Sequence, residues 1–373
     1  MSLPRLPGDA TTSFGRVHPH VSRAGFGCYR VDDRVPAHAR ALRDALTAGV
    51  NLIDTSTNYT DGRSETLVGE VLAEAIAGGK VRREDVVVVT KAGYLQGSNL
   101  AEARRRERAG SPWTNIVPYG PDLWHSISPD FLADQITASL ARLGLSRIDV
   151  FLLHNPEYFL TDADHRGVPK DEARAVFYDR AARAFHSLES EVASGRIRAY
   201  GVSSNTFVVA HERADAVSLP RLLSLAGPGF AVIQLPFNPI ETGARTPVHT
   251  EDGRSVLDVA RAAGLGVLVN RPFNAFSERG LVRFADLPAD ALSGLGRDAA
   301  WEKARVGELH AWVTSTFADA APATGTLAQR TLRALAATPG VDVVLAGMRR
   351  PEYVRDVVEA WVSLDAGSGM GDR

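Results

Sequence analysis

Short runs of apolar, often β-branched residues recur along the chain, and each is followed by a longer stretch with helical spacing. Several of the runs are continuously apolar rather than alternating, which is typical of parallel strands that are buried on both faces. We expect eight such strands, at Arg23–Tyr29, Asn51–Ser56, Val86–Lys91, Ile148–His154, Ile197–Ser203, Ala231–Leu235, Gly266–Asn270 and Val341–Ala346.

The stretches between these runs are amphipathic and have recognisable ends. Glycine follows several of them and proline opens two, as expected at helix termini. The predicted helices are Ala37–Ala48, Glu65–Ala77, Pro129–Leu143, Arg174–Ala193, Ser255–Ala263, Thr326–Ala337 and Pro351–Trp361. Strand followed by helix, repeated eight times, predicts an α/β fold in which a parallel sheet closes into a (β/α)₈ TIM barrel, with an open doubly wound sheet as the alternative.

Two segments are longer than the ~2–6 residues that usually connect strands and helices. Residues 92–128 follow the third strand and contain several aromatic residues and a basic patch, and residues 155–172 follow the fourth strand. Loops after strands lie at the carboxyl mouth of a barrel, where active sites form. The first insertion is therefore either a substrate lid or a decoration of the barrel. We expect a single barrel domain over residues 1–373, since no linker-like segment divides the chain.

The charge balance narrows the classes of partner. The 373 residues include 42 Lys+Arg and 44 Asp+Glu, a formal net charge of −2. This gives no electrostatic reason to expect nucleic acid or an anionic membrane surface. The single cysteine, Cys28, excludes an intrachain disulfide. Because the first residues lack the pattern of a secretion signal and no apolar run reaches ~18 residues, we expect a cytoplasmic protein.

Three predicted strands end in an ionisable residue: Asp54 on the second, Lys91 on the third and His154 on the fourth. Each has a plain structural explanation when taken alone, as a turn cap, a lysine reaching solvent or a core histidine. Consecutive strands of a barrel are neighbours, so we expect the three side chains to converge at one rim. Their coincidence favours a catalytic cluster.

Tyr59 lies on the loop that follows Asp54 and can point back across the barrel mouth. Its pKa of ~10 makes it a poor acid at neutral pH unless a nearby cation favours the phenolate. Lys91 can supply that cation, Asp54 can orient Lys91, and His154 can hydrogen-bond a carbonyl oxygen. Such a set would protonate a carbonyl oxygen while hydride reaches its carbon, or run in reverse for an alcohol. The histidines are scattered without a His-x-x-x-His pair, so we expect no metal site.

The segments around these four residues resemble the aldo-keto reductases, (β/α)₈ barrels that use a nicotinamide cofactor. The most specific is GVNLIDTSTNYTDGRSETLVGEVL, and further matches are VVVVTKAG, SLARLGLSRIDVFLLHNPE, GRIRAYGVSSN and VIQLPFNP. The resemblance runs from GFGCY to PEYVRDVVEA, nearly the whole chain. It implies that Asp54, Tyr59, Lys91 and His154 form a catalytic tetrad with Tyr59 as the general acid and base.

The same resemblance implies a binding site for NADP(H), with NAD(H) as the alternative. It places Gln234 and the segment Ser203–Asn205 at the nicotinamide carboxamide, and an extra serine leaves the register of that segment open by one residue. Where the family usually has an aromatic residue that stacks on the nicotinamide, this chain has Asn270 or Arg271, with Phe273 as a candidate substitute. The full implied set is Gly27, Cys28, Tyr29, Asp54, Ser203, Ser204, Asn205, Gln234, Asn270, Arg271, Arg349 and Arg350.

The segment AGMRRPEYVRDVV resembles the part of the family that binds the adenosine 2′-phosphate. Arg349 and Arg350 would hold this phosphate through planar, bidentate guanidinium contacts. A solvated basic pair at the start of a helix is the alternative. Tyr353 and Val357 stand where the family has an arginine and an asparagine.

We therefore expect a reductase or dehydrogenase whose partner molecule is an aldehyde, a ketone or a sugar hemiacetal. The segment HNPEYF resembles members that oxidise free sugars or lactols. Two alternatives stay open. One is a low-turnover barrel that senses nicotinamide cofactors or acts as a regulatory subunit, suggested by the altered stacking position. The other is a non-redox lyase or isomerase barrel that uses Lys91 as a Schiff-base amine.

Overall fold

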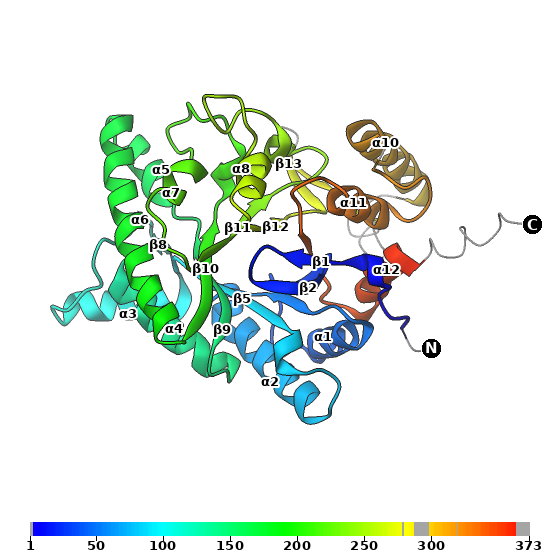
Figure 1. The fold of residues 1–373 in the computed structure, drawn as a ribbon, viewed down its shortest axis with the longest axis horizontal. Helices are drawn as coiled ribbons and strands as arrows, with labels where there is room; N and C mark the ends of the chain where they lie inside the picture. The colour runs from blue at the N-terminus through cyan, green and yellow to red at the C-terminus, as the bar shows by residue number, and fades with distance from the viewer. Residues whose placement is uncertain (1–2, 278–279, 287–297, 319, 363–373) are drawn as a thin grey trace, which may run out of the picture.

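Eight parallel strands close into a barrel in the computed structural model, which describes residues 3–277, 280–286, 298–318 and 320–362 (Figure 1). Around the barrel the order is β10-β11-β12-β15-β3-β4-β5-β9. The strands are β3 (Ala24–Gly27), β4 (Leu52–Asp54), β5 (Val87–Ala92), β9 (Ile148–His154), β10 (Ile197–Ser203), β11 (Phe230–Pro236), β12 (Gly266–Asn270) and β15 (Val343–Ala346). The predicted (β/α)₈ barrel is confirmed.

A helix follows each barrel strand and packs on its outer side. In chain order these helices are α1 (Pro36–Ala48), α2 (Arg63–Ala77), α4 (Pro129–Leu143), α6 (Lys170–Ala193), α7 (Leu219–Leu223), α8 (Val256–Ala262), α11 (Leu327–Ala336) and α12 (Pro351–Val362). The sequence pattern predicts all of these except α7, which has only five residues and so presents too little of a helical face to be recognised.

Alternate residues of the strands point to opposite sides of the barrel wall, because the side-chain period of a strand is two. One buried cluster fills the interior and includes Leu52, Val89, Leu152 and Leu268. The residues between them, such as Ile53, Val88 and Phe151, belong to a second cluster shared with the helices. This alternation decides which residues can reach the barrel mouth.

A hairpin of β1 (Thr11–Phe14) and β2 (His18–Ser22) closes the amino-terminal end of the barrel. Phe14, Val17 and Val21 belong to the interior cluster, so the hairpin acts as a plug. A Cβ atom at Gly266 would lie 2.6 Å from the Phe14 ring, which explains the glycine at the start of β12. The sequence reading did not anticipate this hairpin.

The two predicted insertions are both ordered. The first contains a three-stranded antiparallel sheet, β6 (Tyr94–Leu95), β7 (Val117–Gly120) and β8 (Leu123–His125), with helix α3 (Gly97–Arg108). The second is not a long loop as expected, because it forms α5 (Tyr158–His165) and α6 already begins at Lys170.

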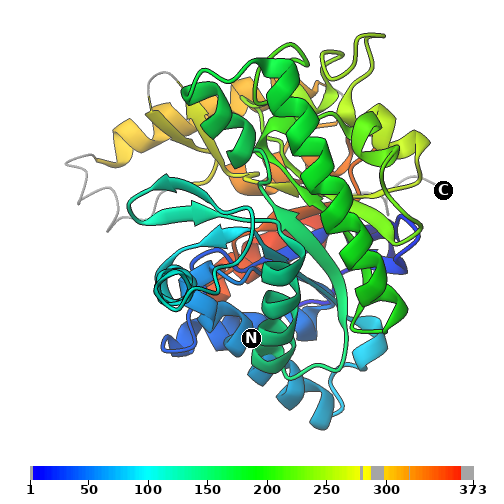
Figure 2. The same ribbon diagram turned by 90° about the vertical axis from the view of Figure 1, so that its left-hand side faces the viewer.

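A third insertion, after β12, was missed. It contains the hairpin of β13 (Asn274–Ser277) and β14 (Gly280–Arg283) and the long helix α10 (Ala299–Phe317). Helix α10 has a weak amphipathic pattern and exposes Trp301 and Trp312, which explains why its sequence did not stand out as a core-facing helix. Figure 2 shows α10 and the hairpin of β7 and β8 projecting from the same side of the barrel.

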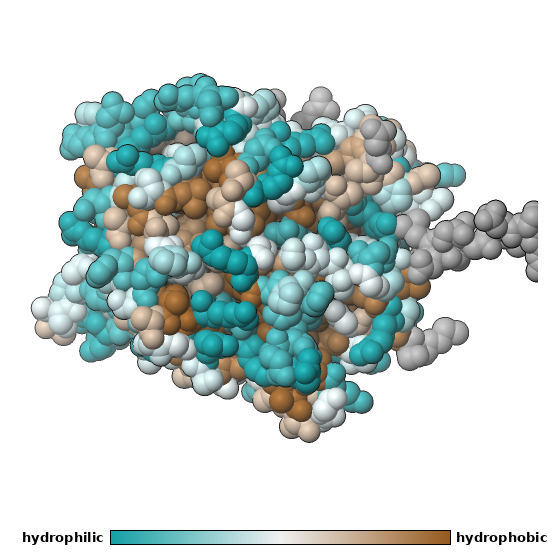
Figure 3. All heavy atoms as spheres, in the orientation of Figure 1, coloured by the Kyte–Doolittle hydropathy of each residue, from teal (hydrophilic) through white to brown (hydrophobic). Residues whose placement is uncertain are grey.

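The surface is mixed in character. In Figure 3 hydrophilic residues cover the upper edge of the molecule and hydrophobic residues are interspersed across the middle of the same face. Among the residues that the structure describes, no helix has the length and apolar character needed to cross a membrane.

Candidate active site

The predicted acid–base residues lie at the carboxyl ends of three adjacent strands. Asp54, Lys91 and His154 each follow an interior residue by two positions, namely Leu52, Val89 and Leu152. They therefore share the interior face of the wall and meet at the mouth. The neighbouring strand pairs β4–β5 and β5–β9 bring them together, as the sequence predicts.

Lys91 and Asp54 form a buried ion pair. Lys91 is fully buried, and its Nζ donates to both Asp54 carboxylate oxygens at 2.7 and 2.8 Å and to the Thr55 carbonyl oxygen at 2.7 Å. Burial lowers the pKa of Lys91 and raises the pKa of Asp54, and the attraction between the two opposes both shifts. An ammonium group has three protons, so all of its donors are used within this cluster.

Tyr59 lies against this pair, but Lys91 does not lower its pKa as the sequence reading expected. The ammonium nitrogen is 5.1 Å from the centre of the Tyr59 ring, in a cation–π contact. Burial and the negative charge of Asp54 raise the pKa of the phenol well above its ordinary value. Tyr59 is therefore a neutral phenol in this structure.

His154 completes the cluster and is neutral. Burial and the charge of Lys91 lower its pKa well below the ordinary value. Its ring is 5.9 Å from the Tyr59 ring in an edge-on arrangement. Ser56 Oγ lies 3.0 Å from His154 Nδ1, so this ring nitrogen is engaged within the chain.

Two aromatic residues from the first insertion support His154, and sequence reasoning missed their role. Tyr94 packs edge-on against the His154 ring at 4.7 Å, and its hydroxyl accepts from Asn155 Nδ2 at 2.6 Å. His125 Nε2 is 2.8 Å from the His154 carbonyl oxygen, and burial lowers the pKa of His125 to about 4. The insertion thus forms a wall beside His154.

The residues expected to hold the nicotinamide lie on β10, β11 and β12. Gln234 Nε2 donates to Asp54 Oδ2 at 2.8 Å, so this side chain serves the ion pair. Gln234 Oε1 accepts from Ser203 Oγ at 3.2 Å and from Asn270 Nδ2 at 3.3 Å. The four side chains form one connected network around the mouth.

The hydrogen bonds of the segment Ser203–Asn205 show which of its two serines is turned away from the mouth. Ser204 Oγ accepts from the backbone N–H of Thr206 and caps the short turn that follows, so it is the serine turned away from the mouth. The backbone N–H of Asn205 donates to Glu157 Oε1 at 2.7 Å. Glu157 is 4% exposed, and burial raises its pKa to about 7. No signal in the sequence beyond its place in HNPEYF singled out Glu157.

The three implied cofactor residues at the end of β3, Gly27, Cys28 and Tyr29, differ in their exposure and in the side of the wall on which they lie. Gly27 lies on the interior side, where a Cβ atom would be 3.2 Å from the Ala346 carbonyl oxygen. The Cys28 thiol is fully buried on the helix side and its pKa is raised by burial, so it belongs to the core. Tyr29 is 66% exposed and its ring packs edge-on against Tyr59 at 5.4 Å, so it borders the mouth.

The remaining implied residues lie after β12 and β15. Arg271 adopts a left-handed backbone conformation with φ of 54° and its guanidinium is 3.1 Å from Glu241. Arg350 is 3.9 Å from Glu352 and lies over the Tyr353 ring, whereas Arg349 has no carboxylate within ion-pair distance among the described residues. Val357 is buried in α12, so it faces the core rather than a ligand.

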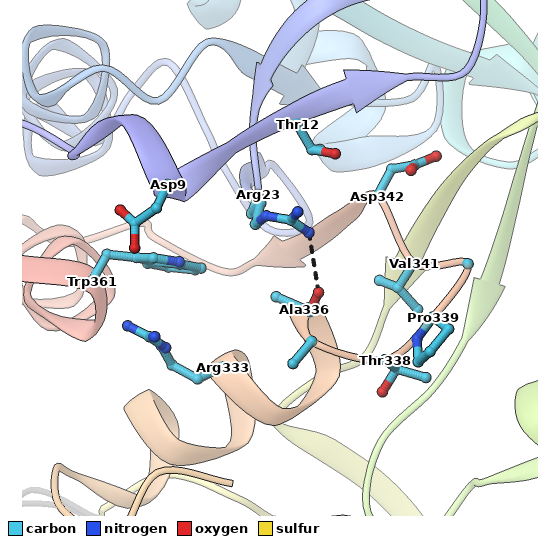
Figure 4. A pocket seen from close by; sticks show the side chains of 12 residues that line it. Asp9, Thr12, Arg23, Arg333, Ala336, Thr338, Pro339, Val341, Asp342 and Trp361 are labelled. Carbon is cyan, nitrogen blue, oxygen red and sulfur yellow. Dashed lines mark hydrogen bonds between the residues drawn. The ribbon is translucent and has the colours of Figure 1, made fainter. Parts of the chain in front are cut away.

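A separate cavity of about 480 Å³ lies at the opposite end of the barrel (Figure 4). Arg23 and Asp342, which line it, immediately precede β3 and β15 and therefore mark the amino-terminal ends of the strands. Arg23 donates to the Ala336 carbonyl oxygen at the end of α11. None of the predicted site residues lines this cavity.

Comparisons with known proteins agree with the fold. A model of the Aldo/keto reductase family matches residues 25–367. An NADH-specific methylglyoxal reductase of Escherichia coli (strain K12) is 29% identical over 216 residues, which cover 57% of this chain and 59% of the relative. A 6-dehydroglucose reductase of Novosphingobium aromaticivorans is 31% identical over 195 residues, 50% of this chain and 48% of the relative.

These alignments show that the chain spans about half the length of the curated relatives it matches. Among solved structures, an aldo/keto reductase from Klebsiella pneumoniae in complex with NADP and acetate has a TM-score of 0.55 and 19% identity, covering 94% of this chain and 89% of that chain. At this identity the match concerns the fold. Because the family model spans nearly the whole sequence, the chain belongs to the aldo/keto reductase family.

Proposed function

We propose that this protein is an NAD(P)(H)-dependent oxidoreductase that transfers hydride between nicotinamide and an aldehyde, a ketone or a sugar hemiacetal. The observation that carries the proposal is the convergence of Tyr59, His154 and the buried Lys91–Asp54 pair at the barrel mouth. The names of the two relatives, reductases of methylglyoxal and of 6-dehydroglucose, support small aldehydes and oxidised sugars as the substrate class.

The cofactor side of the mouth fits a ligand that carries hydrogen-bond donors. Asn270 Oδ1 is a buried acceptor atom with no hydrogen-bond partner in the described part of the chain. An unpaired buried acceptor is unfavourable, so this position favours a bound group that donates. When bound, the nicotinamide would supply or accept the hydride.

The chain's own residues would handle the proton. Neutral Tyr59 can donate its phenolic proton to a carbonyl oxygen, which acquires negative charge as its carbon is reduced. His154 Nε2 can hydrogen-bond the same oxygen, and the Lys91 charge stabilises negative charge near the phenol. The high pKa of Tyr59 keeps the phenol protonated at neutral pH, which is the form that donates a proton in carbonyl reduction.

The two alternatives are less well supported. A Schiff-base role for Lys91 would require a buried ammonium group to lose three hydrogen bonds before its nitrogen could attack a carbonyl. A purely regulatory barrel would not need the complete set of Asp54, Tyr59, Lys91 and His154.

The first test is a titration of the purified protein with NADPH and with NADH, followed by tryptophan fluorescence. Saturable binding of either supports the proposal and permits a screen of aldehydes and sugars for oxidation of the bound form. Absence of binding for both reduced and both oxidised dinucleotides would overturn the proposal.

A further inference from the structure

A chain of hydrogen bonds leads from the catalytic carboxylate to a buried amide oxygen on a strand further round the barrel. Asp54 accepts two bonds from Lys91, and its Oδ2 accepts a third from Gln234 Nε2 at 2.8 Å. A carboxylate can only accept, so Gln234 must turn its NH₂ group towards Asp54. Its carbonyl oxygen, Oε1, is consequently directed the other way.

The same reasoning fixes the orientation of the next amide. Gln234 Oε1 can only accept, and it lies 3.3 Å from Asn270 Nδ2. Asn270 must therefore present its NH₂ group to Gln234 and direct Oδ1 away from it. Asn270 Oδ1 is buried and has no hydrogen-bond partner in the described residues. The charge at Asp54 thus determines, through Gln234, which atom of Asn270 is left over.

Asn270 is placed to use this atom at the mouth. It is the last residue of β12 and lies two positions beyond Leu268 of the interior cluster, so its side chain shares the interior face. The next residue, Arg271, leaves the strand with a left-handed backbone and pairs with Glu241. Asn270, rather than Arg271, therefore faces the site.

We infer that Asn270 Oδ1 accepts an N–H bond from the primary amide of a bound nicotinamide, while Gln234 acts as a positioning residue for Asp54. This inference rests on the proposed function. The family resemblance would lead us to expect a side chain that stacks on the nicotinamide ring at the end of β12. The inference gives this position a hydrogen bond to the amide instead. A primary amide fits because the orphaned atom is a neutral acceptor that needs a donor, not a charged partner.

The test compares each reduced dinucleotide with its 3-acetylpyridine analogue, in which a methyl group replaces the NH₂ of the amide and the carbonyl is kept. Dissociation constants are measured by fluorescence titration of the full chain. We expect the wild type to bind the analogue about tenfold more weakly, as for the loss of one hydrogen bond to a buried acceptor. In Asn270→Ala the two ligands should bind within about twofold of each other, because the acceptor that distinguishes them is gone.

Phe273→Leu is the matched control, since an apolar contact does not distinguish an amide from an acetyl group and the wild-type ratio should persist. Asn270→Val, which likewise lacks an acceptor, provides the same comparison if the alanine variant fails to fold, as judged by thermal melting. An unchanged ratio in the Asn270 variants, or equal affinities in the wild type, would overturn the inference while leaving the proposed function intact. Failure of the wild type to bind any dinucleotide would overturn both.

Discussion

The side chains at the strand ends of the two halves of the barrel mouth differ in how completely they are paired. At the ends of β4 and β5, the Lys91 ammonium uses all three protons within the chain, and its partner Asp54 accepts three hydrogen bonds. At the end of β12, on the other half, Asn270 Oδ1 is buried without a partner in the described residues. The ion pair is thus preorganised, and under the proposed function a ligand completes the other half.

The comparison predicts its largest effect for the group that would move a proton. Tyr59→Phe should lower turnover by about 10²–10⁴-fold, the usual contribution of a positioned general acid. Dinucleotide affinity should change by less than about twofold, because the phenol belongs to the preorganised half. Steady-state kinetics with an active aldehyde and fluorescence titration measure the two effects, and a variant with retained turnover would exclude Tyr59 as the acid.

Breaking the buried ion pair between Lys91 and Asp54 should also destabilise the fold. Lys91→Met leaves the Asp54 carboxylate buried without a cation, and such a change typically costs about 3–5 kcal/mol in the free energy of unfolding. Urea denaturation monitored by circular dichroism gives this quantity.

The control is the double variant Lys91→Met/Asp54→Asn, which removes the unpaired negative charge of Asp54. It should recover part of the lost free energy of unfolding. If it is no more stable than the single variant, the cost comes from packing and not from the unpaired carboxylate.

The burial of Glu157 should appear as a pH dependence of stability. Burial raises its pKa from 4.5 to about 7, so the folded protein holds the proton after the unfolded chain has lost it. The stabilisation from this proton is complete below pH 4.5 and is lost as the pH rises through 7, a change of about 3 kcal/mol.

Glu157→Gln has no proton to lose at this position. As the pH rises from 4.5 to 7, its free energy of unfolding should therefore increase relative to that of the wild type. Urea denaturation at several pH values measures this difference. Parallel curves for the two proteins would show that the carboxyl of Glu157 does not titrate in this range.

The smallest predicted effect concerns the outer edge of the cofactor half. Arg349→Ala should weaken NADPH binding about tenfold, as for one guanidinium–phosphate contact, and leave NADH unchanged. Arg350→Ala should have a smaller effect, because Glu352 already lies 3.9 Å from its guanidinium. Equal losses for both dinucleotides would assign these arginines to the fold and not to the 2′-phosphate.

Local sequence patterns predict the barrel well where burial is continuous. The bounds Ile148–His154, Ile197–Ser203 and Gly266–Asn270 agree with the structure, because parallel strands buried on both faces need long apolar runs. The hairpin of β1 and β2 was not predicted because its apolar residues are few and are buried by distant partners. Phe14, for instance, is covered by the start of β12. Helix α10 was not predicted because its apolar residues do not gather on one face.

Asp54, Lys91 and His154 could be singled out because each is a polar group at the end of an apolar strand, and Tyr59 because it follows Asp54 on the loop at the same rim. Local sequence patterns were enough to predict the eight strands and to single out these groups. The folded chain was needed to show that Gln234 hydrogen-bonds Asp54, that Tyr59 stays neutral beside Lys91 and that Asn270 holds the unpaired acceptor. Hydrogen bonds join residues that are close in space, and Gln234 and Asp54 are separated by 180 positions along the chain.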